Sequence, residues 1–180
     1  MSLNYLFPIP FFVSYKNNVK NFVKEVEEDV KEKKFVEGTS GIVGNNQKKW
    51  INLMNKELKE EIEKFSNSFG IPLELTDAWW AKNKYLGYEP THVHAKCDFV
   101  LTLYLNFDPE EHSSVEFEHP AFDFYSFRGH SKAPFLIFAP KLETGSIIGF
   151  PAHLRHKTPL NKSKQDKIFI AMHLKIKDKF

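Results

Sequence analysis

Three histidines have the side chains and the spacing that a metal site needs. His92 and His94 are separated by one residue in a stretch rich in strand-forming residues, and His156 lies far downstream. Side chains two residues apart on a β-strand point to the same face, roughly 6–7 Å apart along the strand, and imidazole is a good ligand for iron, zinc and copper. If the chain folds back so that His156 faces the pair, the three rings can hold one ion. Otherwise they are three unrelated histidines.

Composition narrows the classes of protein to which the chain can belong. Its 180 residues, with 42% hydrophobic and 15% aromatic residues, suit a single packed domain over residues 1–180. A net charge of only +2 gives no reason to expect nucleic acid or a membrane as partner. The single cysteine, Cys97, excludes an intrachain disulfide and is typical of a reducing compartment. With no signal-peptide pattern and no apolar run of about 18 residues, we expect a soluble protein of the cytoplasm, or of the host cytoplasm for a viral chain.

The N-terminal part contains two stretches with the apolar spacing of amphipathic helices. One stripe begins at Val19 and predicts a helix that ends near Lys33, and a second predicts a helix over about residues 47–66. We expect each helix to pack its apolar face on a sheet. Residues 6–13 are apolar and β-prone, but two prolines limit them to an edge or irregular strand. Glycines and asparagines in 38–46 indicate a loop or a short irregular strand.

From residue 70 onward the pattern changes to β-prone runs separated by polar or turn-forming residues. The runs cover residues 73–85, 91–107, 114–118, 133–138, 145–150 and 167–176. Helices followed by a series of strands indicate an α+β, mainly β fold. We expect residues 71–180 to form an antiparallel sheet pair or barrel, with residues 1–70 as a helical cover on one side.

Two features of the predicted strands bear on a pocket. Trp79 and Trp80 are neighbours on one strand, so they must face opposite ways, one toward the core or a pocket and the other toward a helix or a substrate. His173 has the same strand parity as Lys167 and Ala171, so it can lie directly behind a site that these residues line.

In order and spacing, several segments resemble the iron(II)- and 2-oxoglutarate-dependent oxygenases, in particular small oxygenases of bacteria and their phages related to the prolyl 4-hydroxylases. The segments that carry the resemblance are residues 6–10, 79–88, 92–94, 103–105, 145–156 and 167–172, which together extend over most of the chain. The most specific are the H-x-H motif and the G-x-x-x-x-F-P-x-x-x-x-H segment. The resemblance implies a double-stranded β-helix, a jelly-roll or cupin-like barrel with helices packed on one sheet.

The resemblance also implies that His92 and His156 bind Fe(II). His94 stands where the wider superfamily usually has Asp or Glu, and with three neutral imidazoles the site would keep one more positive charge than a 2-His-1-carboxylate site. His94 is accepted as the third ligand because the small phage-type proteins share the H-x-H motif. Asp98 is a rival, but it lies roughly 13 Å from His94 along a regular strand, too far unless the strand bends.

For the cosubstrate, the resemblance implies that Lys167 meets the distal carboxylate of 2-oxoglutarate as a point charge and that the hydroxyl of Tyr104 donates to the same group. The alternatives are a solvent-facing lysine after a turn and a core aromatic. Both alternatives stay open at the level of sequence.

These assignments lead to one predicted activity and two rivals. The predicted enzyme is a dioxygenase in which His92, His94 and His156 form the catalytic metal centre. It decarboxylates 2-oxoglutarate to succinate, using dioxygen, and hydroxylates a C–H bond of a small-molecule or peptidyl, proline-type substrate. The rivals are a cupin-like three-His metalloenzyme that does not use 2-oxoglutarate, and a barrel protein without turnover that has a binding or structural role.

Overall fold

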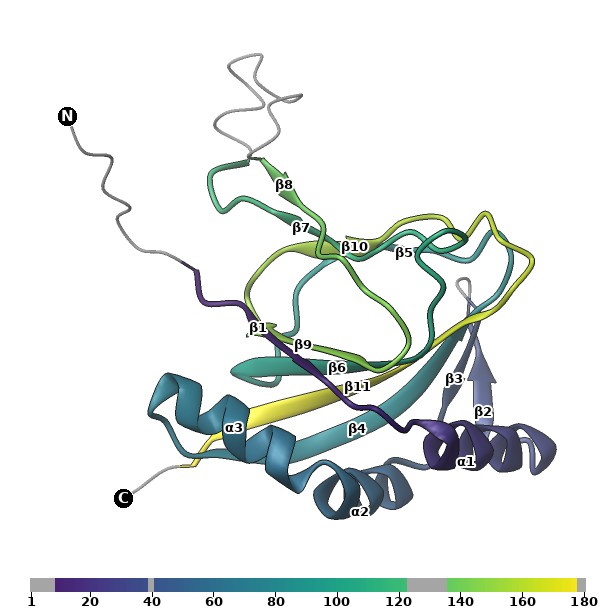
Figure 1. The fold of residues 1–180 in the computed structure, drawn as a ribbon, viewed down its shortest axis with the longest axis horizontal. Coiled ribbons are helices and arrows are strands. Elements are labelled where there is room, and N and C mark those ends of the chain that lie inside the picture. The colour runs from purple at the N-terminus through teal and green to yellow at the C-terminus, as the bar shows by residue number, and fades with distance from the viewer. Residues whose placement is uncertain (1–8, 39–40, 123–135, 178–180) are drawn as a thin grey trace.

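The computed structural model describes residues 9–38, 41–122 and 136–177. Two antiparallel sheets face each other, and three helices cover the outer face of the larger sheet (Figure 1). Within the described ranges the two sheets do not join into a closed barrel. The predicted α+β, mainly β architecture with helices on one side is confirmed.

The helices are α1 (Lys20–Lys31), α2 (Gln47–Glu57) and α3 (Lys59–Phe69). In spatial order the larger sheet contains β1 (Phe12–Tyr15), β9 (Ser146–Pro151), β6 (Phe99–Asn106), β11 (Lys167–Ile176), β4 (Leu73–Asn83), β3 (Gly41–Gly44) and β2 (Phe35–Glu37). The smaller sheet contains β5 (Glu89–His92), β10 (His156–Thr158), β7 (Glu116–Glu118) and β8 (Ile137–Phe138). No helix in the described ranges is long and apolar enough to cross a membrane.

The larger sheet is buried on both faces, and its side chains divide between two hydrophobic clusters. On β4, Trp80 points into the cluster under the helices, whereas Trp79 packs against the cluster between the sheets, as the alternation of strand side chains predicts. On β11, Ile170 joins the helix side and Phe169 the inner side. The centre of the sheet therefore supports a pocket on its inner face.

The helices pack their apolar faces on this sheet, as predicted, but the second predicted helix is in fact two. α2 begins after Asn46, whose side chain accepts a hydrogen bond from the amide of Lys49, and α3 ends at Gly70 with φ of 64°. The break between them is at Leu58, which is fully buried. Because the apolar stripe continues through the break, the sequence pattern gives no sign of it.

The N-terminal part does more than cover the sheet, because it also contributes β1, β2 and β3. β1 lies at the edge of the larger sheet, as the two prolines preceding it predict, although residues 6–8 of the predicted segment lie outside the described residues. Residues 38–46, predicted as a loop or a short irregular strand, contain β3, which pairs with both β2 and β4. Of the predicted strand over 133–138, residues 136–138 are described, and β8 occupies the last two of them.

The predicted continuous strand over residues 91–107 is wrong. β5 ends at His92 and β6 begins at Phe99, with a loop between them. Ala152 holds this loop: it accepts a hydrogen bond from the amide of His94 and donates one to the carbonyl of Asp98, each 2.9 Å long. Because the break depends on pairing with a distant segment, local β propensity does not reveal it.

A buried carboxylate joins α1 to α2 and to the sheet. Asp29 is fully buried and accepts hydrogen bonds from the indole nitrogens of Trp50 (2.7 Å) and Trp80 (3.1 Å) and from Nζ of Lys49 (2.9 Å). Burial by itself raises the pKa of Asp29, but these hydrogen bonds outweigh it and hold the pKa below its usual value. The carboxylate therefore stays ionised in the core.

Replacing Asp29 with alanine is expected to lower the free energy of unfolding by about 3–5 kcal/mol, since two buried indole donors and an ammonium lose their acceptor. The matched control is Glu27→Ala, an exposed acid on the same helix, which should change it by no more than about 0.5 kcal/mol. Urea unfolding at pH 7 measures both. Because the pKa of Asp29 is lowered, its contribution should be present above pH about 4 and lost as the pH falls further. Equal values for the two variants would contradict this role.

Candidate metal centre

The pairing of β5 with β10 brings two of the three histidines together. His92 and His156 are directly opposite each other in the antiparallel register, and their ring centroids are 4.3 Å apart. Residues opposite one another in such a ladder have Cβ atoms about 5 Å apart, so the smaller sheet alone fixes this half of the cluster. β10 was not among the predicted strands, although it carries the expected ligand His156.

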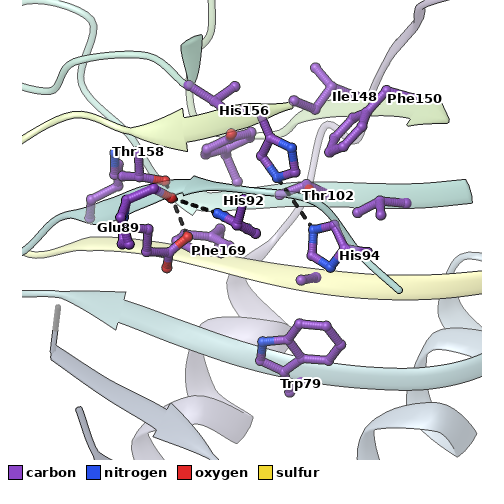
Figure 2. A pocket seen from close by; sticks show the side chains of 16 residues that line it. Trp79, Glu89, His92, His94, Thr102, Ile148, Phe150, His156, Thr158 and Phe169 are labelled. Atoms are coloured by element: carbon purple, nitrogen blue, oxygen red, sulfur yellow. Dashed lines mark hydrogen bonds between the residues drawn. The ribbon is translucent and has the colours of Figure 1, made fainter. Parts of the chain in front are cut away.

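His94 reaches the same point from the loop that follows β5. Its Nε2 atom is 3.3 Å from Nε2 of His156, and one ligand nitrogen from each of His92, His94 and His156 lies within 4.8 Å of the others. Figure 2 shows His94 and His156 directed toward one another, with His92 beside them. The predicted convergence of the three rings is present, although His92 and His94 do not share a strand.

Hydrogen bonds fix which nitrogen of each ring faces the centre. Nδ1 of His92 is 2.8 Å from the carbonyl of Pro90, and Nδ1 of His156 is 2.8 Å from that of Leu154. A carbonyl only accepts, so each Nδ1 carries the proton and each Nε2 keeps its lone pair. Nδ1 of His94 is likewise engaged, 2.9 Å from Nε2 of His173.

The environment of His94, His156 and His173 keeps their imidazoles neutral. Burial, reinforced by the neighbouring histidines, lowers the pKa of His94 to about 3. Burial lowers the pKa of His156 to about 4, although the hydrogen bond to the backbone of Leu154 raises it. Burial also lowers the pKa of His173, opposed by the charge of Asp77. Neutral imidazole is the form that binds metal, so the cluster is poised for a cation at neutral pH.

The donor set suits a divalent transition metal. Nitrogens bound to one ion at about 2.1 Å and at right angles lie about 3 Å apart, close to the 3.3 Å between His94 and His156. Three neutral imidazoles favour iron, zinc, copper or nickel over magnesium or calcium, which prefer oxygen. Three ligands from one side also leave positions for a small molecule.

A cavity of about 300 Å³ opens from the histidines into the space between the sheets. Its walls are mostly apolar and include Val100, Ile148 and Phe150, with Trp79 near His94 (Figure 2). Pockets for small ligands are typically apolar with a few polar groups that orient the ligand. The volume is at the small end of that class, which suits a cosubstrate of few atoms.

Lys167 is the cationic group of this cavity. Its side chain comes from the start of β11, is only 2% exposed, and donates a hydrogen bond from Nζ to the carbonyl of Ser113 (3.1 Å). No acidic side chain among the described residues forms an ion pair with it. Burial lowers the pKa of Lys167 to about 8, although the negative charge of Glu89 raises it. The alternative of a solvent-facing lysine is therefore wrong.

Tyr104 lines the same cavity from β6. Burial raises the pKa of its phenol, and the charge of Glu89 adds to this effect. The hydroxyl therefore stays protonated as a hydrogen-bond donor. Tyr104 also packs in the inner cluster, so its ring is a core aromatic while the residue belongs to the pocket.

Glu89 is a pocket residue that the sequence reasoning missed. It lies on β5 and accepts a hydrogen bond from the hydroxyl of Thr158 (3.3 Å), and both line the cavity (Figure 2). Glu89 lies three residues before His92, and on a regular strand this odd separation would place the two side chains on opposite faces. Only the irregular register between β5 and β10 places it opposite Thr158, so no local sequence pattern points to it.

Asp98, Arg155 and His112 make their contacts outside the cluster. Asp98 accepts a hydrogen bond from the amide of Ile176 (2.8 Å), which agrees with its rejection as a ligand. Arg155 is half-exposed and pairs with Glu118 at 3.0 Å. His112 bonds locally to Asp108. His130 lies outside the described residues.

Compared by sequence, the chain matches no protein-family model and no curated protein. Compared by structure, it is similar to HygX from Streptomyces hygroscopicus with nickel, 2-oxoglutarate and hygromycin B bound (TM-score 0.68, 10% identity, covering 94% of this chain and 84% of HygX). It is also similar to a prolyl-4-hydroxylase of Pseudomonas putida (TM-score 0.67, 8% identity, 94% of both chains). A third similar structure is the non-heme alpha-ketoglutarate-dependent carbocyclase SnoK from nogalamycin biosynthesis (TM-score 0.66, 11% identity, 92% of this chain and 79% of SnoK).

These likenesses establish the fold. The similar structures are 2-oxoglutarate-dependent oxygenases with a jelly-roll fold, and this chain shares it over nearly its whole length. The predicted jelly roll is confirmed. At identities of 8–11%, activity has to be argued from the site.

Proposed function

We propose that this chain, which has the fold of those oxygenases, is itself an Fe(II)- and 2-oxoglutarate-dependent dioxygenase. In this proposal His92, His94 and His156 hold the metal, and Lys167 and Tyr104 bind the cosubstrate. The observation that carries it is the combination, in one small cavity, of three metal-facing imidazoles and a buried lysine with no carboxylate partner among the described residues.

The charges of the cavity agree with a dianionic cosubstrate. Histidine binds a metal as the neutral imidazole, and the charges of Lys167 and Glu89 cancel, so a divalent metal held by the three rings leaves two positive charges. 2-Oxoglutarate carries two negative charges at neutral pH. Bound there, it would neutralise a pocket whose low-dielectric walls make uncompensated charge costly.

Each residue has a defined task in this scheme. When bound, the iron would supply the dioxygen chemistry that couples decarboxylation of 2-oxoglutarate to hydroxylation of a C–H bond. Lys167 donates to the distal carboxylate as a desolvated point charge, and Tyr104 donates its hydroxyl to the same carboxylate. The apolar walls exclude water, which strengthens both contacts. Trp79 borders the centre near His94 and is placed to contact a substrate.

The substrate we propose is a small molecule or a peptide presented at the open side of the metal centre. HygX was crystallised with hygromycin B, and another similar structure is a prolyl-4-hydroxylase, so the same fold accommodates both classes. Hydroxylation of a proline-type C–H bond is the finer form of the proposal. Mass spectrometry of candidate substrates for a gain of one oxygen atom tests it.

The activity itself is tested by succinate formation. Protein purified without oxygen and loaded with Fe(II) should convert 2-oxoglutarate to succinate in air, slowly without a primary substrate, and removal of iron with a chelator should stop it. Iron-independent turnover, or none with iron bound, would contradict the proposal. Iron-dependent consumption of dioxygen without succinate would instead favour a three-His metalloenzyme that does not use 2-oxoglutarate.

The pH dependence of 2-oxoglutarate binding should report Lys167. With a pKa of about 8, the free ammonium is present below pH 8 and is lost as the pH rises, so the Kd should be flat from pH 6.5 to 7.5 and rise by about tenfold per pH unit above 8. Calorimetry on Ni(II)-loaded protein measures it. Glu89→Gln removes a charge that raises this pKa and should shift the rise to lower pH. Lys167→Arg, which stays charged, is the control and should remove the rise. A Kd independent of pH in the wild type would contradict the assignment.

A further inference from the structure

His173 lies directly behind His94, on the side away from the other ligands. Its Nε2 is 2.9 Å from Nδ1 of His94, and the two rings meet edge to face with centroids 4.8 Å apart. The opposite nitrogen of His94, Nε2, is the one that faces His156. The contact therefore joins a ring carried by a loop to β11, a central strand of the larger sheet.

This contact determines which tautomer His94 adopts. For Nε2 to offer its lone pair to a metal, the proton of the neutral ring must be on Nδ1. Nδ1 then donates to Nε2 of His173, which must carry its own proton on Nδ1. In His92 and His156 the proton is held on Nδ1 by a backbone carbonyl, which can only accept a hydrogen bond. His94 depends on a side chain instead.

Asp77 is placed to hold His173 in the accepting form. It is directly opposite His173 in the pairing of β4 with β11. Its Oδ1 is buried with no hydrogen-bond partner among the described residues, while Gln47 donates to Oδ2 at 3.4 Å. The ring of Trp79 also packs edge to face against the ring of His173, with centroids 4.7 Å apart. The negative charge of Asp77 acts on the His173 ring, and a carboxylate that faces Nδ1 would favour a proton there and leave Nε2 as the acceptor for His94.

We propose that His173 is a positioning residue that orients His94 and fixes the tautomer in which Nε2 faces the metal, with Asp77 supporting it. The inference rests on the proposed function and adds to it. Partners of this kind behind metal-bound histidines raise ligand basicity, and their loss typically costs about 10–100-fold in metal affinity. The role is particular to a histidine in the third position, because a carboxylate ligand has no tautomer to fix.

The test measures metal affinity directly. His173→Phe keeps a ring for Trp79 but removes the acceptor, so the affinity of the protein for Co(II), measured by competition with a chromophoric chelator, should fall by about 10–100-fold. The visible absorption of bound Co(II) should also change, because it reports the ligand geometry. His173→Gln, whose side-chain oxygen can accept from His94, should recover most of the affinity.

Control variants separate this effect from general damage. His112→Phe removes another buried histidine, one that bonds to Asp108 and Gln165 away from the cluster, and it should lower stability without changing Co(II) affinity. Asp77→Asn removes the supporting charge and should weaken Co(II) binding by less than His173→Phe does. If the Phe variant does not fold, His173→Leu replaces it.

The outcomes distinguish the inference from the function on which it rests. Wild-type Co(II) affinity in a folded His173→Phe or His173→Leu variant would overturn the inference, and if His156→Ala loses Co(II) in the same assay the proposed metal centre still stands. If His156→Ala also keeps wild-type affinity, the proposed function fails with it. Equal losses in the Phe and Gln variants would show that packing, and not hydrogen-bond acceptance, is what His94 requires, which also overturns the inference.

Discussion

Replacing His156 with alanine is expected to abolish iron-dependent succinate formation and to weaken metal binding by more than about 100-fold. Losing a direct ligand should cost more than the roughly 10–100-fold that losing an outer partner costs. His156 is 5% exposed and pairs in register with His92, and among the described residues its only partners in the possible metal cluster are His92 and His94. Metal analysis of protein dialysed without oxygen, together with the succinate assay, measures both effects.

The matched control for this variant is His153→Ala, an exposed histidine three residues earlier in the same segment. It should bind iron and turn over like the wild type. His94→Ala should lose metal as His156→Ala does. Retention of iron and activity in His94→Ala would mean that the third ligand is wrongly assigned, while the same result in His156→Ala would remove the metal centre altogether.

Replacing Lys167 with alanine is expected to weaken the binding of 2-oxoglutarate by at least about 30-fold, with metal affinity unchanged. Truncating one partner of a buried charge pair costs at least about 2 kcal/mol, and each 1.4 kcal/mol is about tenfold in Kd. The effect should appear in the Kd and KM for 2-oxoglutarate, because Lys167 lies in the wall of the cavity and not among the ligand nitrogens. Calorimetry on Ni(II)-loaded protein measures it.

Two further variants isolate the charge. Lys167→Met keeps the length and packing of the side chain and should bind 2-oxoglutarate about as weakly as the alanine variant. Lys164→Ala removes an exposed lysine from the preceding turn and should change nothing. Unchanged affinity for 2-oxoglutarate in Lys167→Ala would show that the distal carboxylate binds elsewhere, and would leave the metal centre as a site for some other ligand.

Local patterns in the sequence predict most of the helices and strands and supply the candidate side chains of the site. Side-chain periodicity separated the helical cover from the strands, and it required Trp79 and Trp80 to face opposite ways, as they do. The H-x-H motif and the segment ending at His156 identified the three histidines. These features follow from short-range geometry, the 3.6-residue and two-residue repeats, which any stretch of sequence displays without its partners.

How those residues meet depends on the tertiary fold. The register of β5 and β10 places His92 beside His156, and bonds to Ala152 turn the loop that presents His94. Pairing between distant strands also places Glu89 in the cavity with Lys167 and Asp77 opposite His173. Strand register depends on contacts between segments far apart in the chain, and shifting it by one residue turns every side chain to the other face. No local pattern in the sequence records that choice.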